Sequence, residues 1–171
     1  MTRADPVVTA YVALGGNLGP RLANLRAAAA ALAVTPGIKV MGHSAIYETA
    51  AVAATPQPAY LNAVVRVETT LPPRALLDAC LAIEQRQGRV RPAGHDKAPR
   101  TIDLDLLLHG PTVLDQPGLR LPHPGLLDRP FVRVPLADVA LPGLRHPVTD
   151  AALDHAAVPA DVCAISDPLA G

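Results

Sequence analysis

Two aspartates separated by one residue are the side chains of this chain best suited to chemistry. Asp103 and Asp105 lie in the segment Thr101-Ile-Asp-Leu-Asp-Leu106, whose aliphatic residues are typical of a β-strand. Because residues i and i+2 of a strand point to the same face, we expect both carboxylates on one face. Two buried anions repel each other, so the pair must be solvated, matched by arginine or bound to a cation.

A run of basic residues comes just before this pair. It holds a third of the fifteen Lys and Arg residues of the chain: Arg86, Arg89, Arg91, Lys97 and Arg100. Such a run alone is most simply a solvated face, but the planar guanidinium also matches phosphate. Proteins hold Mg²⁺ with one or two carboxylates, water and substrate phosphate. The combined pattern therefore predicts a phosphoryl-transfer site. Its catalytic residues would be Arg89, Arg91, Arg100, Asp103 and Asp105, with both aspartates as metal ligands.

Three other interpretations of the aspartate pair stay open. The charges could protect an edge strand from aggregation. The chain could be a ligand-binding or regulatory module without catalysis, because one fold serves many functions. It could also be another Mg²⁺-dependent transferase with a different acceptor. The sequence contains neither a Walker A motif nor GxGxxG, so any nucleotide must be bound by other means.

Hydrophobic periodicity predicts the elements that would position the pair. We expect, in chain order, a strand over 7–14, a turn over 15–17, a helix from Pro20 to about 35, a broken strand over 38–47, a strand over 60–70, a helix from Pro72 to about 88 and a strand over 101–108. This order is that of the split βαβ pattern, so we predict an α+β, ferredoxin-like sandwich with an antiparallel sheet and helices packed on it. Prolines and glycines after residue 108 permit only short pieces, among them 119–121 and 131–134, and residues 151–157 have weak helical character.

Composition limits the kind of protein that this chain can be. Its 171 residues are 50% hydrophobic and 18% charged, which predicts one globular domain over 1–171 with a weakly assigned tail over 147–171. The formal net charge is zero, so nothing general favours nucleic acid or an anionic membrane. The longest apolar run is too short to span a membrane, and the two cysteines lack metal or disulfide spacing. We expect a cytoplasmic monomer with no nucleic-acid or membrane partner.

Blocks of sequence in a fixed order carry a specific resemblance. The segments Arg89-Val-Arg91 and Ala98-Pro-Arg-Thr-Ile-Asp-Leu-Asp-Leu106 resemble the signature of the 6-hydroxymethyl-7,8-dihydropterin pyrophosphokinases of folate biosynthesis. The remaining blocks are Gly15-Gly-Asn-Leu18, Tyr60-Leu-Asn62, Ile83-Glu-Gln-Arg-Gln-Gly-Arg-Val-Arg91, Leu121-Pro-His123 and Arg129-Pro-Phe131. The resemblance covers residues 7–140.

The resemblance implies an ATP-dependent diphosphotransferase. Members of this family transfer pyrophosphate from ATP to the hydroxymethyl group of the pterin, release AMP and use two Mg²⁺ ions. By this resemblance Asp103 and Asp105 are the metal ligands. Glu84, which as a residue on a helix surface would otherwise be interpreted as structural, belongs to the nucleotide site. The residues assigned to ATP are Glu84, Arg89, Arg91, Lys97, Arg100, His123 and Arg129.

The resemblance also implies a pterin site. A flat, polar heteroaromatic molecule favours a slot between two rings, with an amide at its hydrogen-bonding edge. Tyr60 and Phe131 match the stacking residues of the family, and Asn62 matches the amide. Thr49 and Val52 match positions whose backbone lines the pocket. A lone Phe is usually a core residue, but only 2% of this chain is aromatic, which weakens that interpretation for Phe131.

The chain departs from the family pattern at several positions. Gly16 stands where serine is usual, and Ala50 lies in a segment that is proline-rich in many members. Pro124 follows His123 where some members have tyrosine. Residues 94–97, Gly-His-Asp-Lys, replace an aromatic residue found in some members. None of these changes affects the paired aspartates.

Overall fold

The central strand of the sheet is buried on both of its faces. Along β1 (Val8–Gly16), Val12 and Leu14 point to one side, Tyr11 and Ala13 point to the other, and all four are buried. The structure is a computed structural model and describes residues 5–51, 56–88 and 101–170. A strand buried on both faces needs a layer of structure on each side.

Antiparallel pairing joins six strands into one sheet. Besides β1 these are β2 (Ile38–His43), β3 (Tyr47–Thr49), β4 (Tyr60–Thr69), β5 (Asp103–His109) and β8 (Cys163–Ala164). The order is β5-β1-β4-β3-β8, and β2 also pairs with β4, so β2 and β3 together form the predicted broken strand. A separate antiparallel pair consists of β6 (Leu114–Gln116) and β7 (Leu119–Leu121). Strand β1 thus lies between β5 and β4, as the split βαβ pattern requires.

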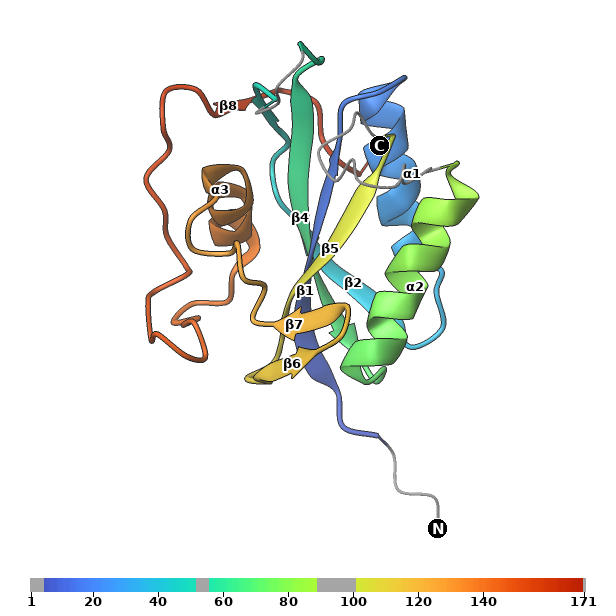
Figure 1. The fold of residues 1–171 in the computed structure, drawn as a ribbon, viewed down its shortest axis with the longest axis vertical. Helices are drawn as coiled ribbons and strands as arrows, with labels where there is room; N and C mark the ends of the chain where they lie inside the picture. The colour runs from blue at the N-terminus through green and yellow to red at the C-terminus, as the bar shows by residue number, and fades with distance from the viewer. Residues whose placement is uncertain (1–4, 52–55, 89–100, 171) are drawn as a thin grey trace.

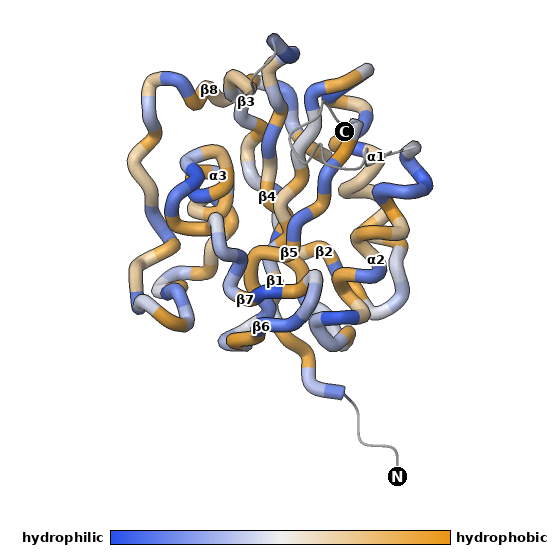
Figure 2. Tube along the Cα trace, viewed as in Figure 1, coloured by the Kyte–Doolittle hydropathy of each residue, from blue (hydrophilic) through white to orange (hydrophobic). Residues whose placement is uncertain are grey.

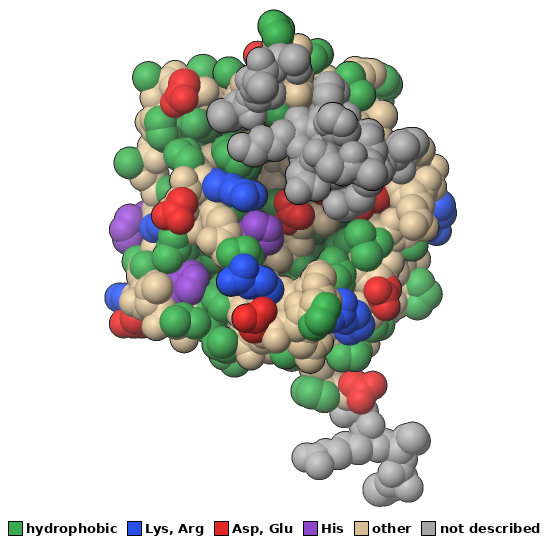
Figure 3. All heavy atoms as spheres, in the orientation of Figure 1, with side chains coloured by type: hydrophobic (Ala, Val, Ile, Leu, Met, Phe, Trp, Pro, Cys, Tyr) green, Lys and Arg blue, Asp and Glu red, His purple; other side chains and the backbone are tan. Residues whose placement is uncertain are grey.

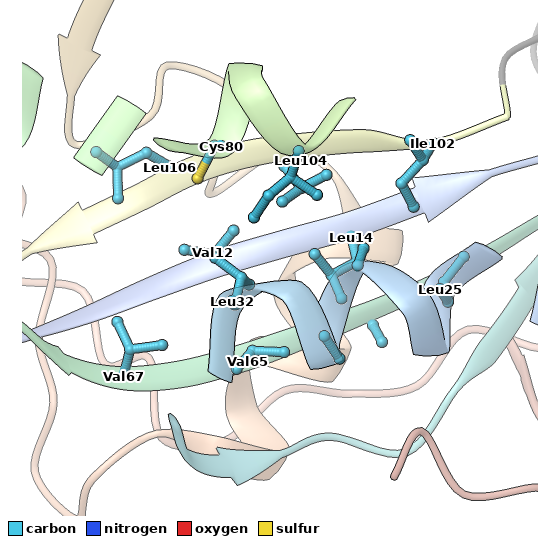
Figure 4. Close-up of a cluster of buried hydrophobic side chains, with 14 of the residues drawn as sticks. Val12, Leu14, Leu25, Leu32, Val65, Val67, Cys80, Ile102, Leu104 and Leu106 are labelled. Atoms are coloured by element: carbon cyan, nitrogen blue, oxygen red, sulfur yellow. The ribbon is translucent and has the colours of Figure 1, made fainter. Parts of the chain in front are cut away.

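Two helices cover one face of the sheet. These are α1 (Arg21–Ala33) and α2 (Pro73–Arg86), and Figure 1 shows both on the same side of the strands. Leu25 and Leu32 of α1 and Cys80 of α2 pack against this face. Figure 4 shows them with the strand residues that point toward them, among them Val12 and Leu104. The predicted α+β fold, with helices packed on an antiparallel sheet, is confirmed.

The third helix covers the opposite face. The sequence predicts only a short piece over 131–134, but α3 (Pro130–Val139) is ten residues long and contains Pro135. It lies on the other side of the sheet from α1 and α2 (Figure 1). Proline lowers helix propensity, but burial of Val132, Leu136 and Val139 against the sheet offsets this cost, because tertiary packing outweighs local preference.

Two further expectations from the sequence are wrong. Gly15 and Gly16 continue β1 instead of forming the turn, and the positive φ of 68° occurs at Gly19. Pairing with β4 and β5 keeps both glycines extended. Residues 151–157 form no helix, and they lie in irregular structure with one bridge from Ala152 to Arg145.

Hydropathy along the chain follows these layers. Figure 2 shows hydrophobic and hydrophilic residues alternating along α2, as a helix with one buried face requires. Among the described residues, no helix combines the length and the apolar character that a membrane span needs.

Core packing by α1 predicts a large effect on stability. Leu32 is fully buried, whereas Val34, two residues further along the chain, is 80% exposed. We expect Leu32→Ala to lower the free energy of unfolding by about 2–5 kcal/mol through lost burial and a residual cavity. Val34→Ala, the matched control, should change it by less than about 0.5 kcal/mol. Urea denaturation followed by circular dichroism measures both, and equal effects would contradict this packing.

Candidate functional site

A row of paired residues crosses three strands on the face opposite to α1 and α2. Asp103 on β5 lies beside Gly15 on β1, and Gly15 lies beside Asn62 on β4. Residues paired across antiparallel strands share a face. Because Gly15 has no side chain, β1 places nothing between the carboxylate and the amide. The row brings a predicted metal ligand and a predicted substrate amide to one surface.

The position of Gly15 admits no larger residue without movement. A Cβ atom there would lie 3.0 Å from Oδ1 of Asn62 and 3.7 Å from the carbonyl oxygen of Leu61. The sequence suggests a turn glycine, and only the pairing register reveals a glycine required by close approach. Gly15 is therefore a site residue that the sequence analysis missed.

The amide of Asn62 is held by the neighbouring strand. Its Nδ2 donates a hydrogen bond of 2.9 Å to Oγ1 of Thr49, and both side chains are buried. Thr49 also pairs with Tyr60 across β3 and β4. The structure thus brings together three of the residues that the resemblance assigns to the pterin.

The segment leading into Tyr60 is fixed by the start of α1. Asn17 is buried, and its Nδ2 donates hydrogen bonds of 3.1 Å to Oε1 of Gln57 and to the carbonyl oxygen of Pro58. Arg21 donates a hydrogen bond of 2.9 Å to the carbonyl oxygen of Ala59. These contacts determine where β4 begins and where Tyr60 lies.

Phe131 lies at the first turn of α3 on the same face of the sheet. It is half-buried and packs against the cluster that contains Ala13 and Val64. These two residues pair with each other, and Ala13 also pairs with Asp105. Phe131 therefore contacts the face that carries the row through Gly15, two residues away from that row along β1 and β4.

Asp105 lines a cavity of 240 Å³ between α2, β5 and β7. The residues around it are Leu77, Asp105, Leu106, Gly118, Leu119, Arg120, His123 and Pro124. Figure 3 shows acidic, basic and histidine side chains close together on the face of the molecule that carries these strands. The sequence analysis missed Leu77, which reads as an ordinary residue of the helix stripe, and Arg120, which no motif marks.

His123 is placed beside the aspartates by backbone contacts. Its N–H donates a hydrogen bond of 3.0 Å to the carbonyl oxygen of Leu107, and its Nδ1 accepts one of 3.0 Å from the N–H of Gly125. The neutral ring then carries its hydrogen on Nε2. Burial, followed by the positive charge of Arg129, lowers the pKa of His123, while Asp103 opposes this shift. His123 is thus a neutral hydrogen-bond donor at pH 7.

Gly125 brings Arg129 close to the histidine. A Cβ atom on Gly125 would lie 2.5 Å from Nε of Arg129 and 2.7 Å from its Cζ, so a side chain at this position would displace the guanidinium from the backbone. Arg129 itself is exposed, and it is available to an anion from solvent. The turn after β7 therefore supplies one neutral donor and one cation to the same place.

Glu84 is buried, which the sequence does not predict for a charged residue of α2. Its Oε1 accepts a hydrogen bond of 2.9 Å from the N–H of Leu104, the residue between the two aspartates. Burial, together with the charges of Glu84 and Asp105, raises the pKa of the nearby Cys80 thiol to about 12. Glu84 thus fixes the edge of β5 where both aspartates lie, and its assignment to ATP stays a prediction.

The chemistry of the donor set fits a hard divalent cation. Asp103 and Asp105 are half-buried carboxylates on one face, and within the described residues no group of three or more His, Cys, Asp or Glu side chains is arranged to hold a metal. Mg²⁺ needs only one or two carboxylates when water and phosphate complete its shell. The pair therefore suits an ion that binds together with a phosphorylated ligand.

Several predicted site residues lie outside the described part of the chain. They are Val52, Arg89, Arg91, Lys97 and Arg100. Their assignments stay predictions from the sequence. The residues that the structure does bring together are Asp103, Asp105 and His123 on one side of Gly15, and Thr49 and Asn62 on the other.

The fold and these side chains define a class of protein. Paired carboxylates, a neutral histidine and an arginine beside a small cavity, on an antiparallel sheet, are the groups of a phosphoryl-transferring enzyme. A sequence comparison supplies the particular family: the profile of 7,8-dihydro-6-hydroxymethylpterin-pyrophosphokinase (HPPK) matches residues 11–141, which is more than half of the chain. The chain belongs to this family.

Individual relatives support this membership. The chain is 47% identical over 131 residues to a 2-amino-4-hydroxy-6-hydroxymethyldihydropteridine pyrophosphokinase from Synechocystis, covering 77% of this chain and 66% of that protein. It is 43% identical over 137 residues to the protein of the same name from Pseudomonas aeruginosa, covering 80% of this chain and 83% of that protein. The folic acid synthesis protein fol1 of Schizosaccharomyces pombe is 39% identical, and the alignment covers 86% of this chain but only 20% of fol1.

Solved structures show the same fold. The wild-type Plasmodium falciparum HPPK-DHPS with pteroate superposes with a TM-score of 0.66 at 13% identity, over 87% of this chain and 43% of that one. The alignment therefore spans less than half of the larger protein. At this identity the likeness concerns the fold alone, and it agrees with the antiparallel sheet and helices described above.

The environment of His123 predicts its titration. Its pKa should lie below the ordinary value of 6.5, because burial and Arg129 both disfavour the charged ring. Arg129→Gln should raise this pKa without restoring 6.5, since burial is the larger cause. Because the unfolded chain binds the proton more readily, the stability that His123 contributes is complete above pH 6.5 and is lost as the pH falls through the lowered pKa. NMR titration of the ring nitrogens measures the pKa of His123 in the unsubstituted protein and in Arg129→Gln. A pKa above 6.5, or no change on substitution, would contradict the assignment.

Proposed function

We propose that this protein transfers pyrophosphate from ATP to the hydroxymethyl group of 6-hydroxymethyl-7,8-dihydropterin, giving the pterin diphosphate and AMP in folate biosynthesis. Family membership supports this proposal. The observation that carries it is the row in which Asp103 and Asn62 flank the bare backbone of Gly15. That row offers a metal-phosphate site and a heterocycle site on one surface, two strands apart.

The nucleotide side of the site lies at β5. Asp103 and Asp105 would hold two Mg²⁺ ions, which when bound supply positive charge to the phosphate chain. The cavity of 240 Å³ beside Asp105, with apolar walls from Leu77 and Leu106, suits a purine base. His123 donates through Nε2 to a phosphate oxygen, and Arg129 adds a positive charge from solvent.

The acceptor side lies at β3 and β4. Asn62 offers both a donor and an acceptor, and its contact with Thr49 fixes the orientation of the amide. Tyr60 and Phe131 supply rings on two sides of the row, and each stacked ring contributes about 0.5–1.5 kcal/mol beyond its burial. The pterin thus lies flat between β4 and α3 with its hydroxymethyl group toward Asp103.

The reaction needs position and charge more than a covalent intermediate. The hydroxymethyl oxygen forms a bond to the β-phosphorus of ATP, the bond from that phosphorus to the oxygen shared with the α-phosphorus breaks, and AMP leaves with the electron pair. The hydroxyl proton passes to solvent or to a neighbouring carboxylate. Negative charge grows on AMP and on the transferred group, where the donor at His123 and the cation at Arg129 stabilise it.

The test of this activity is direct product analysis. Purified protein with ATP, Mg²⁺ and the hydroxymethyl pterin should give AMP and the pterin diphosphate in equal amounts, measured by ion-exchange chromatography. Asp103→Asn and Asp105→Asn should each lower turnover by about 1,000-fold, because metal ions contribute several kcal/mol to such transition states. Asp78→Asn, at an exposed aspartate of α2, is the matched control and should keep full activity.

Other results of this experiment would support a different function for the protein. Formation of ADP instead of AMP would indicate a different phosphoryl transferase. Metal-dependent ATP binding without turnover would leave the acceptor unidentified, and no ATP binding at all would indicate a non-catalytic module. Full activity of Asp103→Asn or Asp105→Asn would refute the metal assignment.

Gly15 provides an independent test of the row. Gly15→Ala brings a Cβ atom to 3.0 Å from Oδ1 of Asn62, so the amide must shift by a few tenths of an ångström from the position that the proposed pterin contact uses. We expect pterin affinity to fall about tenfold, the value of one or two hydrogen bonds, with ATP affinity unchanged. Isothermal titration with each ligand measures this. Gly42→Ala on β2, where a Cβ atom would make only ordinary contacts, 3.7 Å from Cζ of Arg66, controls for the loss of a glycine.

A further inference from the structure

The residues after the family-matched region cross the outer edge of the sheet. The profile of the family ends at residue 141, and residues 156–170, here called the C-terminal brace, continue beyond it. Figure 1 shows this red segment running from the α3 side past β8 to the α1 side, where the chain ends. The brace therefore contacts both layers of the fold.

On the α3 side the brace holds the ring of Tyr47. Val162 is buried and clusters with Tyr47 and Val134. The Tyr47 hydroxyl donates a hydrogen bond of 2.7 Å to Asp138 of α3. Burial, followed by this hydrogen bond and the charge of Asp138, raises the pKa of Tyr47, so its hydroxyl stays protonated at neutral pH.

At the edge of the sheet the brace adds a strand to β3. Tyr47 pairs with Ala164 and Glu48 with Cys163, and the N–H of Ile165 donates a hydrogen bond of 2.8 Å to the carbonyl oxygen of Ile46. A three-residue edge strand paired on one side only is weakly held. Pairing on both sides makes β3 an interior strand.

On the α1 side the brace is anchored by a bidentate contact. Nε and Nη2 of Arg26 donate hydrogen bonds of 3.0 and 2.8 Å to the carbonyl oxygen of Pro168. The next residue, Leu169, is 2% exposed and belongs to the main core. Anchors on both layers keep β8 against β3.

The side-chain contact that joins β3 directly to α1 is weaker than these anchors. Arg21 and Glu48 form an ion pair of 2.8 Å, but their side chains are 32% and 42% exposed. Exposed pairs of this kind contribute little. Apart from the contacts of Tyr47 with α3, the position of β3 therefore depends on its backbone partners, β4 on one side and the brace on the other.

We propose that the C-terminal brace is a positioning element for the acceptor site. It holds β3 in register, β3 carries Thr49, and Thr49 orients the amide of Asn62. This inference rests on the proposed function, because it assigns the brace to the affinity for the pterin. The nucleotide site on β5 lies at the opposite edge of the sheet, so the brace should not affect ATP.

Substitution of Ile165 tests this directly. Ile165→Pro removes the N–H that bonds Ile46, whereas Ile165→Ala keeps it and removes only the side chain. We expect Ile165→Pro to weaken pterin binding about fivefold or more and Ile165→Ala by less than about twofold, with ATP affinity unchanged in both. Isothermal titration measures the affinities, and hydrogen exchange of Tyr47 to Thr49 reports the release of β3.

The possible outcomes separate this inference from the proposed function. Two results would overturn the brace proposal. One is equal pterin affinity in Ile165→Pro and Ile165→Ala although hydrogen exchange shows that β3 is released in Ile165→Pro. The other is a loss of ATP affinity in Ile165→Pro as large as its loss of pterin affinity. A second variant, in which the chain ends at Pro159, removes β8 together with the anchors at Pro168 and Leu169. Normal pterin affinity in this variant, if it folds, would also overturn the brace proposal. If that variant does not fold, Ile165→Pro decides. Absence of pterin binding in the unsubstituted protein would instead refute the proposed function.

Discussion

The register of β1 between β4 and β5 is the constraint on which the site depends. Side chains alternate along a strand, so a slip of one residue would exchange the two faces. Asp103 and Asp105 would then enter the helix-covered core, while Leu104 and Leu106 would face the site. Burial of these leucines under α1 and α2 prevents the slip. The packing of one face therefore determines the chemistry of the other.

The folded structure also determines the charge of the groups around the site. Two ionisable groups near the site have a specific compensation: Glu84 accepts a hydrogen bond from a backbone N–H, and His123 stays neutral beside Arg129. The aspartates are half-buried, so solvent can reach them, as the proposed cation requires. The protein thus keeps negative charge at the edge of β5 and hydrogen-bond donors near it, which is the arrangement that the proposed metal-bound polyphosphate requires.

The sequence predicts the parts of the fold that follow regular periodicity. The strands and the first two helices have clear hydrophobic patterns, and their order is that of a split βαβ sandwich. The helix α3 is not predicted, because two prolines hide a pattern that only burial against the sheet stabilises. The tail likewise has no periodicity, since its contacts with β3 and Arg26 join residues far apart in sequence.

The residues of the site also differ in whether the sequence predicts them. Strand spacing predicts Asp103 and Asp105, the family resemblance predicts Asn62 and Thr49, and the structure brings these four residues to one face. The importance of Gly15 and Gly125 depends on which atoms approach them, which no local pattern records. The burial of Glu84 depends on the packing of α2 against β5. Close approach and burial are properties of the folded chain, and they explain what the sequence does not reveal.

The two cysteines differ in a way that has a practical consequence. Cys80 is buried, and its pKa of about 12 keeps it a thiol at neutral pH, whereas Cys163 is exposed on β8. Thiol reagents attack the thiolate, so they select the accessible residue. A spin label or fluorophore can therefore be attached to the brace at Cys163 without introducing or removing any residue.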